Sequence, residues 1–68
     1  KLADTIKYLR TVRGESQAKL ASQLGVSQSA VAKWELGRSE PSAGAIVKMC
    51  RHFHKSADYL LGLRESEF

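Results

Sequence analysis

The segment from Gln17 to Leu36 constrains the fold more than any other part of the chain; its sequence is QAKLASQLGVSQSAVAKWEL. Apolar residues recur at helical spacing on both sides of Gly25, which predicts two short amphipathic helices. Gly25 can adopt the positive φ of a tight turn, and Ala21 leaves room where the two helices cross. Val31 anchors the second helix on its apolar side. The spacing therefore predicts two helices that pack steeply across a short turn.

Serine and glycine residues mark where the helices of the chain are expected to begin and end. Serine is a favoured N-cap, and glycine is favoured just past the end of a helix. Helices are expected to begin at Ser16, Ser27, Ser42 and Ser56, and to end at Gly14, Gly25 and Gly62. A loop is expected from Gly37 to Pro41. With a first helix near Leu2, five short helices account for the chain.

The apolar residues at helical spacing define the expected core. They are Leu2, Ile6, Leu9, Leu20, Ala21, Leu24, Val26, Val31, Trp34, Ile46, Met49, Cys50, Phe53, Ala57, Leu60 and Leu61. Val47, Tyr59 and Leu63 fall outside this set and are the expected contacts with a second copy. The pattern predicts an all-α, compact five-helix domain over residues 1–63. A polar end at residues 64–68 is expected to fray.

The size and composition of the chain exclude several classes of function. A chain of 68 residues is one domain at most and is too small to bury a deep active-site cleft. Its few candidate side chains do not supply a nucleophile, a base and an orienting acid, so we expect neither an enzyme nor a cofactor. A single cysteine excludes an internal disulfide and suits a reducing cytoplasm. No apolar run approaches the length of a membrane span, so a soluble, cytoplasmic protein without membrane contact is expected.

The charge of the chain favours polyanionic partners. Eleven Lys and Arg residues against seven Asp and Glu residues give a formal net charge of +4. No acidic residue occurs between Glu15 and Glu35, so this segment can approach phosphate groups without acidic repulsion.

Four stretches of the chain carry a family resemblance that covers nearly all of it. They are LRTVRGESQ, LASQLGVSQSAVAKWELG, EPSAGAIVKM and SADYLLG. With these stretches the chain resembles the phage repressor and Cro-like helix-turn-helix family of DNA-binding proteins. The resemblance implies a lambda-repressor-like fold that binds double-stranded DNA, with the helix at residues 27–36 in the major groove. It also implies a transcriptional regulator, more often a repressor, that binds a palindromic operator as a homodimer. The alternative is a protein-interaction module of the same fold, such as an antitoxin or an anti-activator, with little DNA affinity of its own.

The outward face of the helix at residues 27–36 has side chains suited to base edges. Gln28 can pair with adenine, Lys33 can donate to guanine, and Ser29 can bind either kind of edge. Ala32 offers a methyl group to thymine or keeps the helix close to the groove. Trp34 shares the face of Val31 and is expected in the core and not against a base.

Three residues outside this helix are expected to contact phosphates. Gln17 would place its amide and a free backbone N–H of a helix N-terminus beside a phosphate. Arg38 and Ser39 are expected in a loop, where the turn at Gly37 would expose further N–H groups.

Two charged residues fall on apolar helix faces and need partners. Glu35 has the helical phase of Val31 and Trp34, and an unpaired carboxylate there would be costly. Arg10 has the same problem on the first helix. Members of the resembled family often pair an arginine at the position of Arg10 with a glutamate after this helix, so the resemblance implies an Arg10–Glu35 ion pair with a structural role; Arg13 is the competing partner for Glu35.

Several positions depart from the family pattern. Glu15 stands where an apolar residue is common, and His54 and Lys55 stand where a glycine and an apolar residue are usual. Cys50, His52 and His54 invite a metal site, but a structural zinc site needs four ligands and the chain offers no second pair. No metal is therefore expected, and Cys50 is expected to pack as a small apolar residue.

Overall fold

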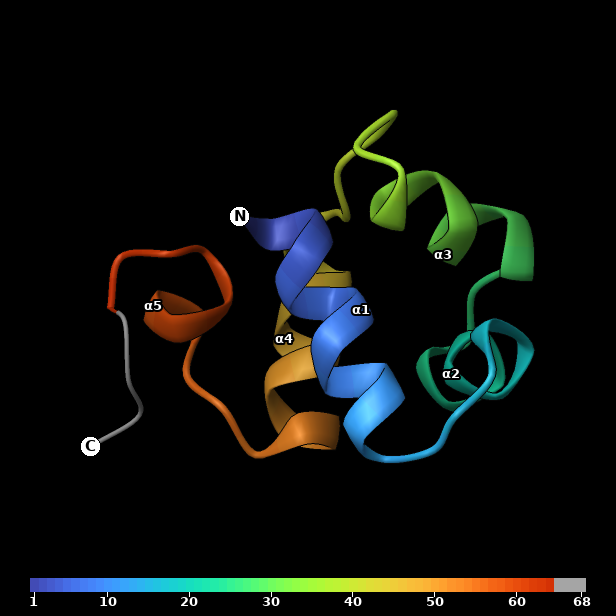
Figure 1. Cartoon of the computed structure of the whole chain (residues 1–68), viewed down its shortest axis with the longest axis horizontal. Helices are drawn as coiled ribbons and strands as arrows, with labels where there is room; N and C mark the ends of the chain where they lie inside the picture. Colours follow the sequence, from blue (N-terminus) through green and yellow to red (C-terminus); the bar gives the residue numbers. More distant parts are fainter. Residues whose placement is uncertain (65–68) are drawn as a thin grey trace.

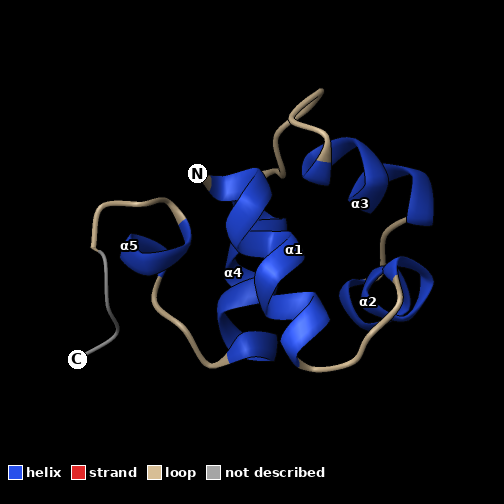
Figure 2. Cartoon of the chain, in the orientation of Figure 1, coloured by secondary structure: helices blue, strands red, loops and turns tan. Residues whose placement is uncertain are grey.

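Five helices and no strand make up the part of the chain that the structure, a computed structural model, describes, which is residues 1–64 (Figures 1 and 2). The helices are α1 (Leu2–Val12), α2 (Gln17–Leu24), α3 (Gln28–Glu35), α4 (Ala43–Phe53) and α5 (Ala57–Leu60). The prediction of an all-α fold of five helices is confirmed. The end expected to fray comprises residues 64–68. Arg64 is exposed, and residues 65–68 lie outside the described residues. None of the helices within residues 1–64 has the length and hydrophobicity needed to span a membrane.

Serine N-caps fix the start of four helices, because each hydroxyl oxygen accepts a hydrogen bond from a backbone N–H of the first turn. The caps are Ser16, Ser27, Ser42 and Ser56, whose oxygens lie 3.0 to 3.1 Å from the N–H groups of Lys19, Ala30, Ala45 and Tyr59. The predicted helix starts are thereby confirmed.

The turn between α2 and α3 depends on Gly25, which has φ 70° and ψ 32°. This left-handed conformation is strained for residues with a side chain. The N–H of Val26 donates to the carbonyl of Ala21, and Lys48 of α4 donates to the carbonyl of Leu24, so the exposed end of α2 is capped from two sides. In Figure 1, α2 is seen nearly end-on while α3 lies across the view. The two helices therefore cross steeply, as predicted.

The core is a single cluster contributed by all five helices. Its buried residues are Ile6, Leu9, Leu20, Ala21, Leu24, Val31, Trp34, Ala45, Met49, Phe53 and Leu60. Leu2, Val26, Ile46 and Cys50 are half-buried against it. Trp34 belongs to the core, which confirms the prediction from its spacing. Ala45 is buried although the sequence pattern did not single it out.

The prediction for the last helix is wrong at three positions. Ala57 and Leu61 were expected to face inward but are exposed, whereas Tyr59 was expected outside the core and is half-buried against it. The reason is the length of α5, since one helical turn of four residues can bury only a narrow sector, here occupied by Leu60. The side of Tyr59 is further covered by Lys55, whose Nζ lies 5.3 Å from the centre of the ring.

Candidate nucleic-acid interface

The outward side of α3 presents the four predicted base-contacting residues together. At 3.6 residues per turn, Val31 and Trp34 occupy the inward side. Gln28, Ser29 and Lys33 are exposed and Ala32 is half-buried on the opposite side. The helix is fixed at its start by the cap from Ser27 and along its inward side by the core, so the fold sets the direction of this face.

Glu35 ends α3 and is held in a network of hydrogen bonds from two other helices. Arg10 of α1 donates from Nε to Oε2 at 2.6 Å and from Nη2 to Oε1 at 3.0 Å, and Gln17 of α2 donates from Nε2 to Oε1 at 3.0 Å. The side chains of Glu35 and Arg10 are 4% and 14% exposed. The ion pair therefore connects α1 to α3 with bidentate geometry, which is the strong form of this contact.

The electrostatics of the pair keep both groups charged. Burial raises the pKa of Glu35, but the hydrogen bonds from Arg10 and Gln17 and the positive charges of Arg10 and Lys7 outweigh burial, so the pKa lies below its ordinary value. The hydrogen bond to Glu35 raises the pKa of Arg10. Because the negative charge of Glu35 is offset by Arg10 and its carboxylate is nearly buried, it adds little negative potential to the outward face of α3.

Gln17 is the first residue of α2 and was expected at a phosphate through its side chain and its backbone N–H. In the structure its amide nitrogen donates to Glu35, so the side chain has an intramolecular role. The backbone N–H lies in the first turn of α2, where N–H groups have no acceptor within the helix. The backbone of Gln17 is therefore the part suited to an anion.

A hollow of about 260 Å³ lies beside this network, where α1, α2 and α3 meet. Its lining residues are Lys7, Arg10, Gln17, Ala32, Glu35 and Leu36. Lys7 is exposed here, one helical turn before Arg10, and was not identified from the sequence; its spacing from Arg10 is the signal that could have found it. The hollow thus joins the face of α3 to the basic side of α1.

The loop after α3 carries the exposed side chains of Arg38 and Ser39. The expectation of free N–H groups at its start is wrong, because the N–H of Gly37 donates to the carbonyl of Trp34 and that of Arg38 to the carbonyl of Lys33. These bonds satisfy carbonyls that the end of α3 would otherwise leave unpaired. Contact of Arg38 with a phosphate would have to come from its side chain.

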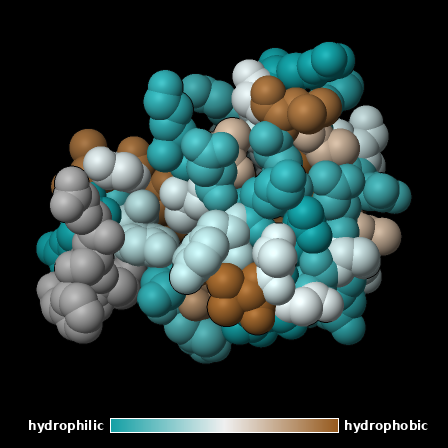
Figure 3. All heavy atoms as spheres, viewed as in Figure 1, coloured by the Kyte–Doolittle hydropathy of each residue, from teal (hydrophilic) through white to brown (hydrophobic). Residues whose placement is uncertain are grey.

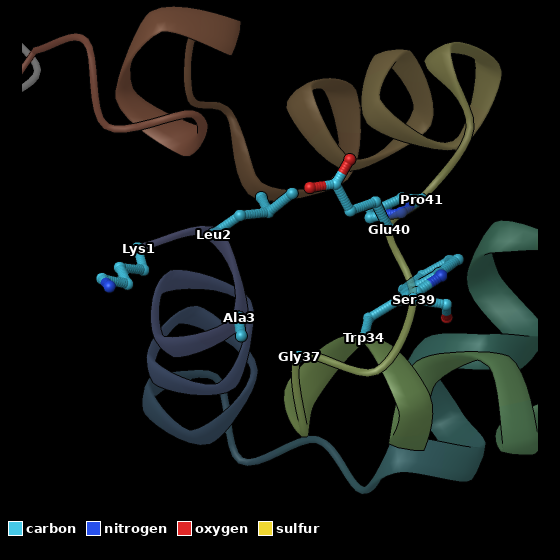
Figure 4. A pocket seen from close by; sticks show the side chains of 8 residues that line it. All are labelled: Lys1, Leu2, Ala3, Trp34, Gly37, Ser39, Glu40 and Pro41. Atoms are coloured by element: carbon cyan, nitrogen blue, oxygen red, sulfur yellow. The ribbon is translucent and has the colours of Figure 1, made fainter.

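A shallow pocket of about 200 Å³ separates this loop from the start of α1 (Figure 4). Leu2 and Glu40 point into it from opposite sides, and Trp34 forms part of its wall. The pocket lacks a set of side chains that could act together as nucleophile and base.

Glu15, the acidic departure from the family pattern, lies between α1 and α2, and its carboxylate is paired. Its carboxylate lies 2.9 Å from Nε2 of His52 in α4, and Arg13 donates to it at 3.2 Å. Arg13, the competing partner expected for Glu35, is therefore paired with Glu15. Burial raises the pKa of Glu15, but the hydrogen bonds from His52 and Arg13 outweigh burial and lower it overall.

The residues considered for a metal site are not brought together. His52 binds Glu15, and Cys50 is half-buried against the core. Within residues 1–64, no group of three or more His, Cys, Asp or Glu side chains has an arrangement that could hold a metal ion.

Leu36 is one of three exposed apolar residues, with Tyr8 and Val12, that the sequence analysis left unassigned. It follows α3 directly and is 68% exposed. Figure 3 shows a mostly hydrophilic surface with a few separate apolar groups, one of which lies over the region of α3.

Five helices arranged in this way, with an exposed helix face whose one carboxylate is buried and paired with Arg10, define a helix-turn-helix domain of the type that binds DNA. The chain belongs to the Helix-turn-helix family, which matches residues 6–60. It is a family of transcriptional regulators, and the resemblance to phage repressors is confirmed.

Two curated relatives are transcriptional regulators. The chain is 31% identical over 65 residues to the SPbeta prophage-derived uncharacterized HTH-type transcriptional regulator YonR of Bacillus subtilis (strain 168), covering 96% of this chain and 60% of that protein. It is 34% identical over 62 residues to the HTH-type transcriptional activator BcrR of Enterococcus faecalis, covering 91% of this chain and 30% of that protein. The chain therefore spans less than two thirds of the first relative and less than one third of the second.

Solved structures share the fold. The P22 c2 repressor protein, in complex with synthetic operator 9T, has a TM-score of 0.83 and 29% identity, covering 87% of this chain and 89% of that one. A chain of the SinR protein/SinI protein complex has a TM-score of 0.82 and 27% identity, covering 90% of this chain and 60% of that one.

Proposed function

We propose that the chain binds double-stranded DNA sequence-specifically as a transcriptional regulator, with α3 inserted into the major groove. The observation that carries the proposal is the outward face of α3. It is exposed, rigidly held and free of accessible acid, because the one carboxylate on α3, that of Glu35, is 4% exposed and paired with Arg10. The similarity to a repressor whose structure contains an operator supports the same use of the fold.

Four side chains of α3 are proposed to contact base edges. Gln28 matches the paired donor and acceptor of adenine, and Lys33 matches the two acceptors of guanine. Ser29 can bind either edge, and Ala32 sets the distance of the helix from the groove or touches a thymine methyl group. Their shared exposure on one side of α3 supports a joint role.

Phosphate contacts are proposed on both sides of α3. The backbone N–H of Gln17 and the side chains of Arg38 and Ser39 lie in segments that flank the base-contacting helix. Such contacts set the register of the protein on the duplex but carry no sequence information.

A homodimer on a palindromic operator, acting in the cytoplasm, completes the proposal. One α3 spans only a few base pairs, so two half-sites about 34 Å apart are needed for useful specificity. Val47 and Leu63 are exposed apolar residues that could contribute to contact between copies. Repression is the simpler action because it requires only occupancy of the operator, although BcrR carries the name of an activator.

Salt-dependent binding tests the proposal. Affinity for a duplex should fall on a log-log scale with a slope of about −0.9 for each phosphate neutralised. Gln28→Ala and Lys33→Ala should each cost about 1 to 3 kcal/mol and relax preference at one base position. Arg38→Ala should weaken specific and random duplexes equally. Equal losses on both duplexes for all three variants would refute the assignment of roles.

A protein-interaction module is the second candidate, and the SinR/SinI complex is the observation that favours it. In this case the outward face of α3 would bind a protein partner. Binding to duplex DNA would then be weak and would show no steep dependence on salt.

A further inference from the structure

Leu36 is held in a defined place although its side chain is exposed. Its backbone has φ −86° and ψ −6°, which continues the right-handed helical path beyond α3. Its N–H donates to the carbonyl of Ala32 at 3.1 Å. The helix thus fixes the direction of the Leu36 side chain, which is 68% exposed.

That direction is the centre of the proposed base-contacting face. At about 100° per residue, the side chain of Leu36 emerges between the directions of Ala32 and Lys33, which precede it by four and three residues. Ser29, seven residues earlier, has nearly the same direction. Leu36 therefore extends the polar stripe of α3 with one large apolar side chain at its C-terminal end.

The surroundings of Leu36 favour a nucleic-acid partner. It borders the hollow lined by Lys7, Arg10 and Glu35, where the charges of Arg10 and Glu35 offset each other and Lys7 adds a positive charge. An apolar side chain beside the positive charge of Lys7, on a face continuous with the base-contacting residues, can approach DNA together with its neighbours. A leucine has no donor or acceptor, so it can contribute only by burying apolar surface. In the major groove, that surface is the C5 methyl group of thymine.

We propose that Leu36 contacts a thymine methyl group at the outer end of the sequence contacted by α3 and selects thymine at that position. The inference rests on the proposed insertion of α3 into the major groove. The contact is apolar and therefore independent of salt. Burying one methyl or methylene group changes a binding constant about fourfold, so the preference for thymine over uracil should have about this size.

The experiment uses the duplex with the highest affinity from a random pool and copies in which each thymine in turn is replaced by uracil. Uracil lacks only the C5 methyl group. Dissociation constants are measured for the wild type, Leu36→Ala and Leu36→Met. Val12→Ala is the matched control, because Val12 is a 64% exposed apolar residue at the end of α1.

The proposal expects one thymine whose replacement by uracil weakens DNA binding by the wild type about fourfold. The same replacement should leave the dissociation constant of Leu36→Ala unchanged. Leu36→Ala should bind the parent duplex at least about fourfold more weakly, Leu36→Met should keep the sensitivity to uracil, and Val12→Ala should match the wild type. If Leu36→Ala weakens binding equally on every duplex, the contact is with deoxyribose and the proposal is wrong. Unchanged binding by Leu36→Ala also overturns it. A wild type that binds no duplex refutes the proposed function and this inference together.

Discussion

Removal of Arg10 alone should largely unfold the domain. Arg10→Met takes two of the three hydrogen bonds from the carboxylate of Glu35 and leaves only the one from Gln17. The side chain of Glu35 is 4% exposed, so water has little access to replace the lost donors. Breaking a buried ion pair in this way costs about 3 to 5 kcal/mol. The core of so small a domain supplies about the same amount, so little folded protein should remain.

The reciprocal change should cost less. Glu35→Met leaves the guanidinium of Arg10 with the carbonyl of Glu15, to which it donates at 2.7 Å, and with partial access to water at 14% exposure. We expect a cost of about 1.5 to 3 kcal/mol, typical of hydrogen bonds to a charged group. In the double variant both charges are gone, and apolar side chains in their place are tolerated. The double variant should therefore be more stable than Arg10→Met alone.

Urea unfolding followed by the fluorescence of Trp34, the one tryptophan, measures these free energies. Sucrose in all samples keeps the weakest variant partly folded. Arg13→Met is the control, because the side chain of Arg13 is 43% exposed and its loss should cost below about 1 kcal/mol. The reasoning is refuted if the costs of the two single variants add in the double variant to within about 0.5 kcal/mol, since independent sites behave in this way.

Three further predictions concern stability. His54→Gly should stabilise the protein by about 0.5 to 1 kcal/mol, because His54 has φ 58° at the end of α4; an unchanged or lower urea midpoint would contradict this. Ser27→Ala should cost about 1 kcal/mol in the same assay through loss of the α3 cap, while Ser29→Ala, outside the cap, should change little; equal effects would be contrary. The pKa values of Glu15 and Glu35 lie below the ordinary 4.5, so their stabilisation is present above that pH and is lost as the pH falls through the folded-state pKa. The melting temperature of the wild type should fall on acidification, and that of Glu35→Gln should fall less. An equal fall in both proteins would argue against Glu35 as a source of the pH-dependent stability.

Local signals predicted most of the helix boundaries. A serine cap needs only the N–H groups of the next turn, and Gly25 needs only its own backbone freedom, so each is encoded within a few residues. Local phase also showed that Arg10 and Glu35 each need a partner, because each charge falls on an apolar face and cannot be buried alone, and the family resemblance favoured Arg10 over Arg13 as the partner of Glu35.

Contacts between distant segments could not be predicted in the same way. Glu15 and His52 are 37 positions apart, and their meeting depends on how α4 packs against the turn after α1. The side chain of Gln17 turned to Glu35 for the same reason, since only the folded arrangement brings α2 beside the end of α3. The single turn of α5 is too short for periodicity to define its inward side. For this reason the expected burial of Leu61 and the expected exposure of Tyr59 were both wrong.

Methylation of bound DNA by dimethyl sulfate tests most directly whether α3 enters the major groove. The reagent modifies guanine N7 in the major groove and adenine N3 in the minor groove, so one reaction reports on both. On the duplex selected from a random pool, the protein should protect guanine N7 atoms within the site and leave adenine N3 atoms reactive, and Lys33→Ala should restore one guanine. Protection confined to adenine N3, or unaltered methylation of guanine in a fully bound duplex, would contradict the account.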